Sequence, residues 1–363
     1  MLSPETIRSA PKVLLHDHLD GGLRASTIVE LAKDLGVKSL PTYNVTELDN
    51  WMAATADRKD LELYLEAFSH TLSVMQTQDA LYRVAAECAE DLAKDGIIYA
   101  EVRFAPELHL SKGLTVTQVI ESVLEGFKSG SEGKGIIVNT LICAIRSRAR
   151  SKEMMEYALH FRSKGIVGFD IAGPEIGYPP SGHIEAFNLA IDEDFPVTIH
   201  AGEVGGVDYI REAVEDCGAS RIGHGIGLQE EVPSDEDSRI EEGKLLSFFL
   251  DQQIALELCP SSNLHIGAVD FLSEHPISRF IDLGLCATIN TDNRLMSNTS
   301  LSKELHICSE TFGWDITTVY TLMRNALSSS FMSSQLKEDL NSCLLYTSPS
   351  PRDRTRSRMP SSA

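Results

Sequence analysis

The stretch VLLHDHLDG, residues 13–21, places two histidines two positions apart at the end of an apolar run. On a strand, positions i and i+2 point to the same side, so His16 and His18 would project together from one rigid segment. Two imidazoles in this arrangement can supply half of a zinc site. Taken alone, the pattern is more often the polar end of an ordinary strand, so further ligands must come from elsewhere.

Two other apolar runs end in the missing ligand types. VTIHAGE offers His200 as a third neutral nitrogen ligand and Glu203 three positions later, and TINTDN offers Asp292 as an oxygen ligand. Three histidines and one aspartate at strand ends match the open catalytic kind of zinc site, in which a water completes the coordination. The sequence therefore predicts a catalytic metal centre.

The run RIGHG adds His224 between Gly223 and Gly225, whose missing side chains leave room to bring the imidazole close to a bound substrate. Beside the predicted ligands, His224 is interpreted as a catalytic residue rather than an ordinary rim histidine. The remaining seven histidines lack such partners and are expected to be structural or solvated. They are His70, His109, His160, His183, His265, His275 and His306.

Eight short apolar runs predict the strands that must position these residues. They cover residues 12–16, 97–104, 136–145, 165–173, 196–202, 221–225, 254–259 and 285–292. Segments with helical patterning lie between most of these runs, for example 77–96, 116–130, 151–165 and 205–218. Strand and helix alternating in this way is typical of an α/β fold of the (β/α)8 TIM barrel kind. The alternative, a doubly wound sheet, lacks a G-x-G-x-x-G sequence after the first strand.

The segment between the first two strands, residues 26–75, is longer than a crossover needs. It contains DLELYLEAFSHTLSVM, which places Leu61, Tyr64, Leu65 and Phe68 at helical spacing. Two interpretations remain open from the pattern: a helical insertion that packs on the body, or a lid over the barrel mouth.

Composition favours an enzyme acting on a small molecule. The net charge of −21 argues against nucleic acid or an anionic membrane as a partner. The N-terminus lacks the pattern of an export signal, no run of apolar residues is long enough to span a membrane, and seven scattered cysteines form no disulfide framework. A cytoplasmic location is therefore expected.

A change of composition near the C-terminus predicts the domain organisation. Residues 1–344 are expected to form a single barrel domain. Residues 345–363 are rich in Ser, Pro and Arg without periodicity, which is typical of a disordered tail or of sequence that does not belong to the fold.

Six motifs in the chain resemble, in order and position, those of adenosine deaminases in the amidohydrolase superfamily. They are HDHLDG, DIAGPE, VTIHAGE, RIGHG, CPSSN and TINTDN, within residues 8–344. The resemblance implies one zinc ion per chain, held by His16, His18, His200 and Asp292, whose charge lowers the pKa of a bound water. It also implies that Glu203 protonates N1 of the purine and that His224 and Asp292 orient and deprotonate the attacking water. Adenosine or 2′-deoxyadenosine would yield inosine or 2′-deoxyinosine and ammonia.

The same resemblance implies the residues that bind the purine nucleoside. Asp20 would lie near the ribose 5′-hydroxyl, His18 would also face the substrate, and the backbone amide of Gly173 would meet a ring nitrogen. Leu61, Tyr64, Leu65 and Phe68 would form an apolar lid that excludes water. From the residues alone, Asp20 before two glycines is more typical of a turn.

Two positions depart from the family pattern. Asn293 stands where a second aspartate often contacts N7, and its amide can still donate a hydrogen bond there. Pro174 replaces a frequent acidic residue after the glycine of DIAGPE.

Other classes of function are less well supported by the sequence. A binuclear amidohydrolase usually needs a carboxylated lysine at the end of the fourth strand, but here that strand ends FDIAG and has no lysine. A cytidine-deaminase site needs H-x-E followed by P-C-x-x-C, which CPSSN does not supply. A non-catalytic binding relative would be expected to lack one of the predicted ligands or Glu203, and all are present. Within the family, adenine or aminofutalosine remains an alternative substrate.

Overall fold

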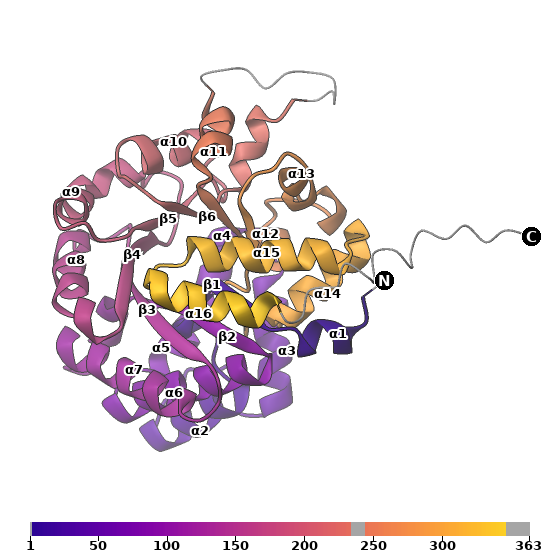
Figure 1. Cartoon of the computed structure of the whole chain (residues 1–363). Coiled ribbons are helices and arrows are strands. Elements are labelled where there is room, and N and C mark those ends of the chain that lie inside the picture. The colour runs from indigo at the N-terminus through magenta and orange to yellow at the C-terminus, as the bar shows by residue number, and fades with distance from the viewer. Residues whose placement is uncertain (1, 234–243, 346–363) are drawn as a thin grey trace, which may run out of the picture.

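The computed structural model describes residues 2–233 and 244–345 (Figure 1). Its eight strands fall within or overlap the eight predicted runs, which confirms them. They are β1 (Lys12–His18), β2 (Ile97–Phe104), β3 (Ile137–Ile145), β4 (Ile166–Ala172), β5 (Thr198–Ala201), β6 (Arg221–His224), β7 (Ala255–Leu258) and β8 (Ala287–Ile289). Residues 346–363, most of the predicted tail, lie outside the described residues.

The strands form two parallel four-stranded sheets, ordered β1-β2-β3-β4 and β5-β6-β7-β8. Single bridges join the sheets at both seams, Phe169 with Val197 and Asp17 with Asp292. At the second seam the Asp292 N–H donates to the His16 carbonyl over 3.0 Å, and the His18 N–H donates to the Asp292 carbonyl over 2.7 Å. Hydrogen bonding at this seam therefore ties the ends of the first and last strands together.

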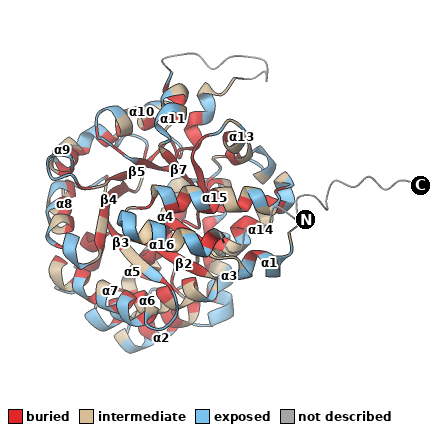
Figure 2. Cartoon of the chain, viewed as in Figure 1, coloured by how far each residue is buried: buried red, intermediate tan, exposed pale blue. Residues whose placement is uncertain are grey.

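One helix after each strand covers the outside of the barrel, as the alternating pattern predicts. In order these helices are α6 (Gln78–Lys94), α7 (Val116–Ser131), α8 (Ser151–His160), α9 (Ile184–Asp192), α10 (Val207–Glu215), α11 (Leu245–Gln252), α13 (Ile277–Asp282) and α14 (Leu301–Phe312). Figure 2 shows the buried residues on the strands and on the inward faces of these helices. The α/β barrel fold is thus the one that the sequence predicts.

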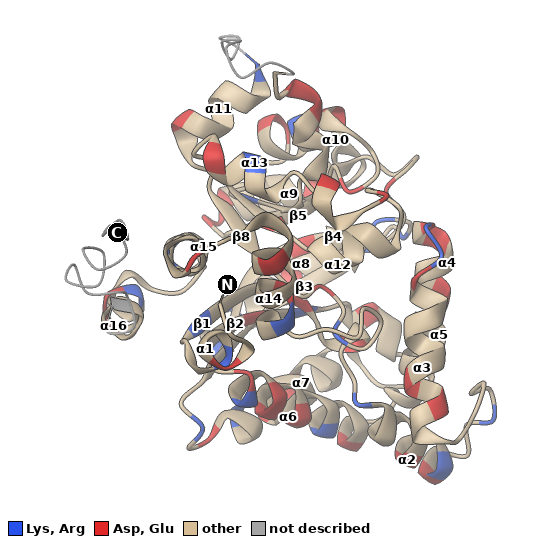
Figure 3. Ribbon diagram, turned by 90° about the vertical axis from the view of Figure 1, so that its right-hand side faces the viewer, with Lys and Arg blue, Asp and Glu red and all other residues tan. Residues whose placement is uncertain are grey.

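The predicted insertion after β1 consists of α2 (Ala25–Leu35), α3 (Val45–Ala56), α4 (Leu61–Glu66) and α5 (Phe68–Val74), which precede α6. The predicted amphipathic segment is therefore two short helices, which meet at Ala67. Figure 3 shows α4 and α5 at one end of the barrel and α15 (Ile316–Ser329) with α16 (Ser334–Leu345) at the other.

Two further short helices complete the fold. They are α1 (Pro4–Ser9), ahead of β1, and α12 (Pro260–His265), directly after β7. Within the part of the chain that the structure describes, no helix has the length and apolar character needed to cross a membrane.

Candidate metal centre and active site

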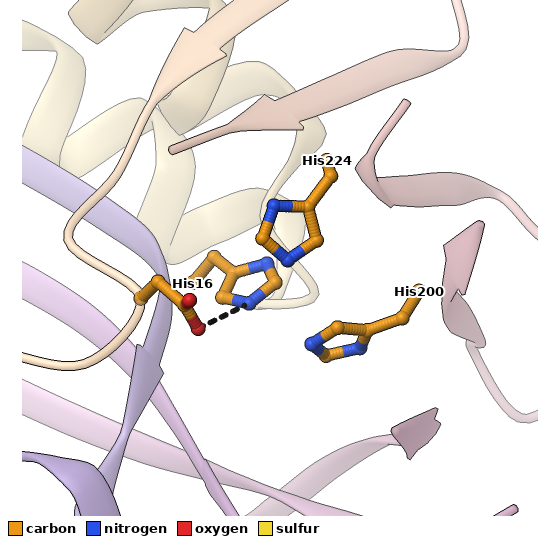
Figure 4. A group of neighbouring side chains, drawn as sticks. His16, His200 and His224 are labelled. Atoms are coloured by element: carbon orange, nitrogen blue, oxygen red, sulfur yellow. Dashed lines mark ion pairs between the residues drawn. The ribbon is translucent and has the colours of Figure 1, made fainter. Parts of the chain in front are cut away.

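Four strand ends bring three histidines and one aspartate together. His16 lies on β1, His200 on β5 and His224 at the end of β6, and Asp292 follows β8. One ligand atom from each of these buried residues lies within 4.8 Å of the other three. Figure 4 shows the imidazoles of His16, His200 and His224 turned towards a common space. These are the donor types of a transition-metal site.

His18, the second histidine of β1, borders this group. Its Nε2 atom lies 3.2 Å from Nε2 of His200 and 3.3 Å from Oδ1 of Asp292. The same Oδ1 atom lies 3.3 Å from Nε2 of His16. The structure therefore places all four predicted ligands next to one another, with His224 as a fifth neighbour.

Hydrogen bonds below the cluster leave two imidazole lone pairs facing it. Nδ1 of His16 lies 3.0 Å from Glu257, and Nδ1 of His200 lies 2.9 Å from Asp170. Because a carboxylate accepts hydrogen bonds, each Nδ1 carries the proton and each Nε2 keeps its lone pair. Nε2 of His16 has no hydrogen-bond partner among the described residues although the side chain is fully buried. With Nδ1 of His16 protonated, its Nε2 atom faces another acceptor, Oδ1 of Asp292 at 3.3 Å, and this buried arrangement is costly unless a cation lies between them. The residues therefore fit a divalent metal ion.

Close packing of strand β6 against the cluster depends on Gly223. A Cβ atom added there would lie 3.2 Å from Cε1 of His16 and 3.2 Å from Cα of His200. The missing side chain of Gly223 thus leaves room for two of the predicted ligands, whereas the sequence suggested room for His224 beside a substrate.

Backbone strain coincides with two residues of the cluster. His224 and Asp292 both adopt left-handed conformations, with φ of 62° and 55°. Such conformations cost about 1–3 kcal/mol each and occur preferentially at functional sites. The Ser262 hydroxyl donates to Oδ2 of Asp292 over 2.7 Å, which leaves Oδ1 directed at the histidines.

Glu203 lies in the loop after β5 with its carboxyl group close to the cluster. Burial, together with the charges of Asp292 and Glu175, raises the pKa of Glu203 well above its usual value. Glu175 accepts hydrogen bonds from the N–H groups of Gly202, Val204 and Gly205 at 2.6, 2.8 and 2.7 Å. The loop that carries Glu203 is therefore held from both sides of this residue, and burial of its carboxyl group favours the protonated form.

One pocket beside the cluster collects the predicted site residues, apart from His16, which lies deeper. Its polar part includes His18, Asp20, His200, Glu203, His224, Asp292 and Asn293, with Gly173 on the rim. Leu61, Tyr64, Leu65 and Phe68, from α4 and α5, form its apolar wall. Tyr64 is buried and the other three are partly buried, so the insertion covers the pocket as the lid interpretation predicts.

Asp20 is buried in the pocket wall rather than exposed on a turn. Its Oδ1 atom has no hydrogen-bond partner among the described residues and lies 3.9 Å from Nδ1 of His18. Burial raises the pKa of Asp20 to about 7. The carboxyl group is thus available to a ligand.

Glycines help to place the two remaining substrate-binding candidates, Asn293 and Gly173. A Cβ atom at Gly21 would lie 1.9 Å from Oδ1 of Asn293, so Gly21 makes the space that Asn293 fills. Gly173 has a φ of 106°, which favours glycine.

The carboxyl ends of the parallel barrel strands carry a cluster of histidines and an aspartate, and an apolar pocket lies beside it. This combination defines the class of barrel metallohydrolases. The chain belongs to the adenosine deaminase family, whose model matches residues 11–346.

Individual relatives agree with this family. The chain is 52% identical over 335 residues to Adenosine deaminase 1 of Streptomyces coelicolor, covering 91% of this chain and 85% of that protein. Among solved structures, adenine deaminase from Arthrobacter aurescens matches with a TM-score of 0.83 and 25% identity, covering 93% of this chain and 98% of the other. The Arabidopsis protein ADAL complexed with GMP matches with a TM-score of 0.81 and 27% identity, covering 95% and 99%.

Several residues that support the cluster were not predicted from the sequence. Arg103, Asp170 and Glu257 lie inside the barrel, fully buried, and Arg103 bridges the two carboxylates at 2.6 and 2.7 Å. Charged residues within the apolar runs YAEVRF, GFDIAG and IALELC were the available signal. Ser262 and Asn263 stood in the quoted motif CPSSN, but no role was assigned to them.

Proposed function

We propose that this chain is a zinc-dependent hydrolase that converts adenosine and 2′-deoxyadenosine into inosine and 2′-deoxyinosine with release of ammonia. The observation that carries the proposal is the buried Glu203, with its raised pKa, beside the histidine and aspartate cluster. Family membership and the name of the relative at 52% identity support the same reaction.

His16, His18, His200 and Asp292 would hold one zinc ion, with the unpaired Nε2 of His16 as the best-defined ligand atom. When bound, zinc supplies a Lewis acid that makes water a nucleophile near neutral pH.

The residues of this chain would divide the proton transfers between them. Glu203 gives its proton to N1 of the purine, which makes C6 electrophilic. Water then adds to C6, Asp292 accepts its proton, and His224 orients the attacking oxygen. Asp292 then returns its proton to the amino group, and the C6–N6 bond breaks as ammonia leaves. The proton of the C6 hydroxyl returns to Glu203, so the product keeps oxygen at C6 and a proton on N1.

The pocket walls would select the nucleoside. The apolar side chains of Leu61, Tyr64, Leu65 and Phe68 exclude water from the purine. The unpaired Oδ1 atom of Asp20 takes the 5′-hydroxyl of the ribose, while Gly173 and Asn293 meet the ring nitrogens.

A panel of substrates tests the proposal. Ultraviolet absorbance is followed with adenosine, 2′-deoxyadenosine, adenine, AMP and a 5′-modified nucleoside, each with and without a chelator. Adenosine and 2′-deoxyadenosine should be deaminated and the chelator should abolish the reaction. Faster turnover of adenine or of the 5′-modified nucleoside would favour the alternative, a deaminase of another 6-aminopurine.

A further inference from the structure

A chain of hydrogen bonds runs from the backbone of helix α13 to His224 in the pocket. The Ile277 N–H donates to Nδ1 of His275 over 3.2 Å, and Nε2 of His275 lies 3.1 Å from Oδ1 of Asn263. Nδ2 of Asn263 in turn lies 3.2 Å from Nδ1 of His224. All three side chains are buried, at 3%, 0% and 1% exposure for His275, Asn263 and His224.

The first bond fixes the direction of all the others. A backbone N–H can only donate, so Nδ1 of His275 must be an acceptor and its proton must lie on Nε2. Nε2–H of His275 then donates to the Asn263 carbonyl oxygen, and the Asn263 amide donates to Nδ1 of His224. The opposite orientation of the Asn263 amide would force two hydrogens together between Ile277 and His275.

His275 is neutral, as this directionality requires. Burial lowers the pKa of His275 to about 3. The sequence interpretation of His275 as a structural or solvated residue is therefore incomplete, because the ring also connects a helix end to the pocket.

We propose that His275 and Asn263 are positioning residues that set the tautomer of His224, so that neutral His224 presents an N–H group, and not a lone pair, to the pocket. Nε2 of His224 lies 3.5 Å from Oε1 of Glu203 on the pocket side. The inference rests on the proposed deamination for its catalytic meaning: His224 donates a hydrogen bond to the attacking oxygen, and the proton of the water goes to Asp292.

The same chain of hydrogen bonds gives His224 a different tautomer from the other histidines of the cluster. Carboxylates at Nδ1 of His16 and His200 leave lone pairs on their Nε2 atoms, whereas an amide donor at Nδ1 of His224 leaves a proton there. The three imidazoles in Figure 4 are close in space, but the hydrogen bonds behind them give His224 a different role.

The direct test reads the tautomer by nuclear magnetic resonance of protein labelled with ¹⁵N in histidine. Spectra are recorded with and without zinc, and His224→Gln identifies the His224 signals. Protonated Nε2 and unprotonated Nδ1 in the wild type are expected. The opposite pattern overturns the proposal, and this reading does not depend on enzyme activity.

Asn263→Asp is the sharpest variant because a carboxylate of the same shape can only accept. Its oxygens should draw a proton to Nδ1 of His224, so the ¹⁵N signals should change, and kcat for adenosine should fall about 10²–10⁴-fold with little change in KM. Asn325→Asp is the matched control, since the Asn325 amide donates to the Ala287 carbonyl outside the pocket. It should leave the His224 signals unchanged. Unchanged His224 signals in Asn263→Asp would overturn the proposal.

Two variants of His275 separate positioning from packing. His275→Gln keeps a donor for Asn263, whereas His275→Leu removes it and frees the amide to turn over. The Gln variant should retain the wild-type tautomer and at least tenfold more activity than the Leu variant. Equal loss in both, with the His224 signals unchanged, would show that His275 only packs. Loss of adenosine deamination in the wild type, with the expected tautomer, would instead reject the proposed function alone.

Discussion

Nη1 of Arg103 lies 2.6 Å from Oδ2 of Asp170, and both side chains are completely buried inside the barrel. The same guanidinium contacts Glu257 at 2.7 Å, so one cation pairs with both carboxylates that face Nδ1 of His200 and His16. Glu257 also pairs with Arg221 at 2.6 Å. A single residue thus connects the supports of two metal-ligand candidates from opposite sheets of the barrel.

Arg103→Met should therefore weaken both folding and metal binding. Removing the cation leaves Asp170 without its arginine partner and Glu257 with Arg221 alone, and breaking a buried ion pair typically costs about 3–5 kcal/mol of stability. Loss of such supporting groups typically lowers metal affinity about 10–100-fold. Thermal unfolding and zinc titration measure the two effects.

Arg83→Met is the control, because Arg83 pairs with Glu30 and Glu87 at the surface, where such pairs contribute about 0–1 kcal/mol. Equal losses of melting temperature and zinc affinity in the Arg103 and Arg83 variants would contradict the prediction.

Glu203→Gln should keep the metal and lose deamination. The amide has the shape of the protonated carboxyl group but cannot release a proton to N1 of the purine, so activity should fall about 10²–10⁴-fold or more. Metal content measured beside steady-state kinetics decides the outcome. Activity within a few-fold of the wild type would remove Glu203 from the role of acid.

Asp20→Asn should stabilise the protein in a pH-dependent way. The pKa of Asp20 is about 7 in the folded protein and about 4 in an unfolded chain. Folding therefore favours the protonated form, and the ionised form lowers stability progressively as pH rises from about 4 to 7, after which the cost stays constant. The asparagine variant lacks this cost. Its gain in melting temperature should grow between pH 5 and 7 and level off above, and a gain independent of pH would argue against a raised pKa.

Asp20 should also exclude 5′-phosphorylated substrates. A phosphate near this buried carboxyl group places like charges together, so AMP should be a very poor substrate above pH 7. Free adenine should be poor as well, because it leaves the carboxyl group unpaired. Asp20→Ala should lower kcat/KM for adenosine. It should also reduce the difference in kcat/KM between adenosine and 5′-deoxyadenosine, because the latter has no 5′-hydroxyl. Equal wild-type efficiency on these two nucleosides would place Asp20 outside the substrate site.

The strands and the polar residues at their ends were predictable from the sequence. Each strand is a short apolar run, and His16, His200, His224 and Asp292 all stand where such a run stops. In a parallel barrel those ends converge, so linear order alone indicates which residues meet.

The residues behind the cluster were less predictable because their roles depend on pairing in three dimensions. Arg103 and Glu257 appear in the sequence as charges inside apolar runs, and nothing local shows that they meet. His275 is 51 positions from His224 and joins it only through the turn of α12 that carries Asn263. Likewise, the periodicity of the lid segment does not predict its division into α4 and α5 at the buried residue Ala67.

The apolar wall of the pocket comes from α4 and α5, one continuous insertion between β1 and β2, whereas the metal-binding candidates are distributed over strands of both sheets. One part of the substrate pocket is therefore encoded apart from the metal-binding candidates, whereas Asp20 and Asn293 are encoded beside them. Exchanging residues 61–74 between relatives would replace one apolar side of the pocket and leave every proposed metal ligand and its supporting network in place. A barrel built in this way can acquire new aminopurine substrates by recombination of one short exchangeable segment.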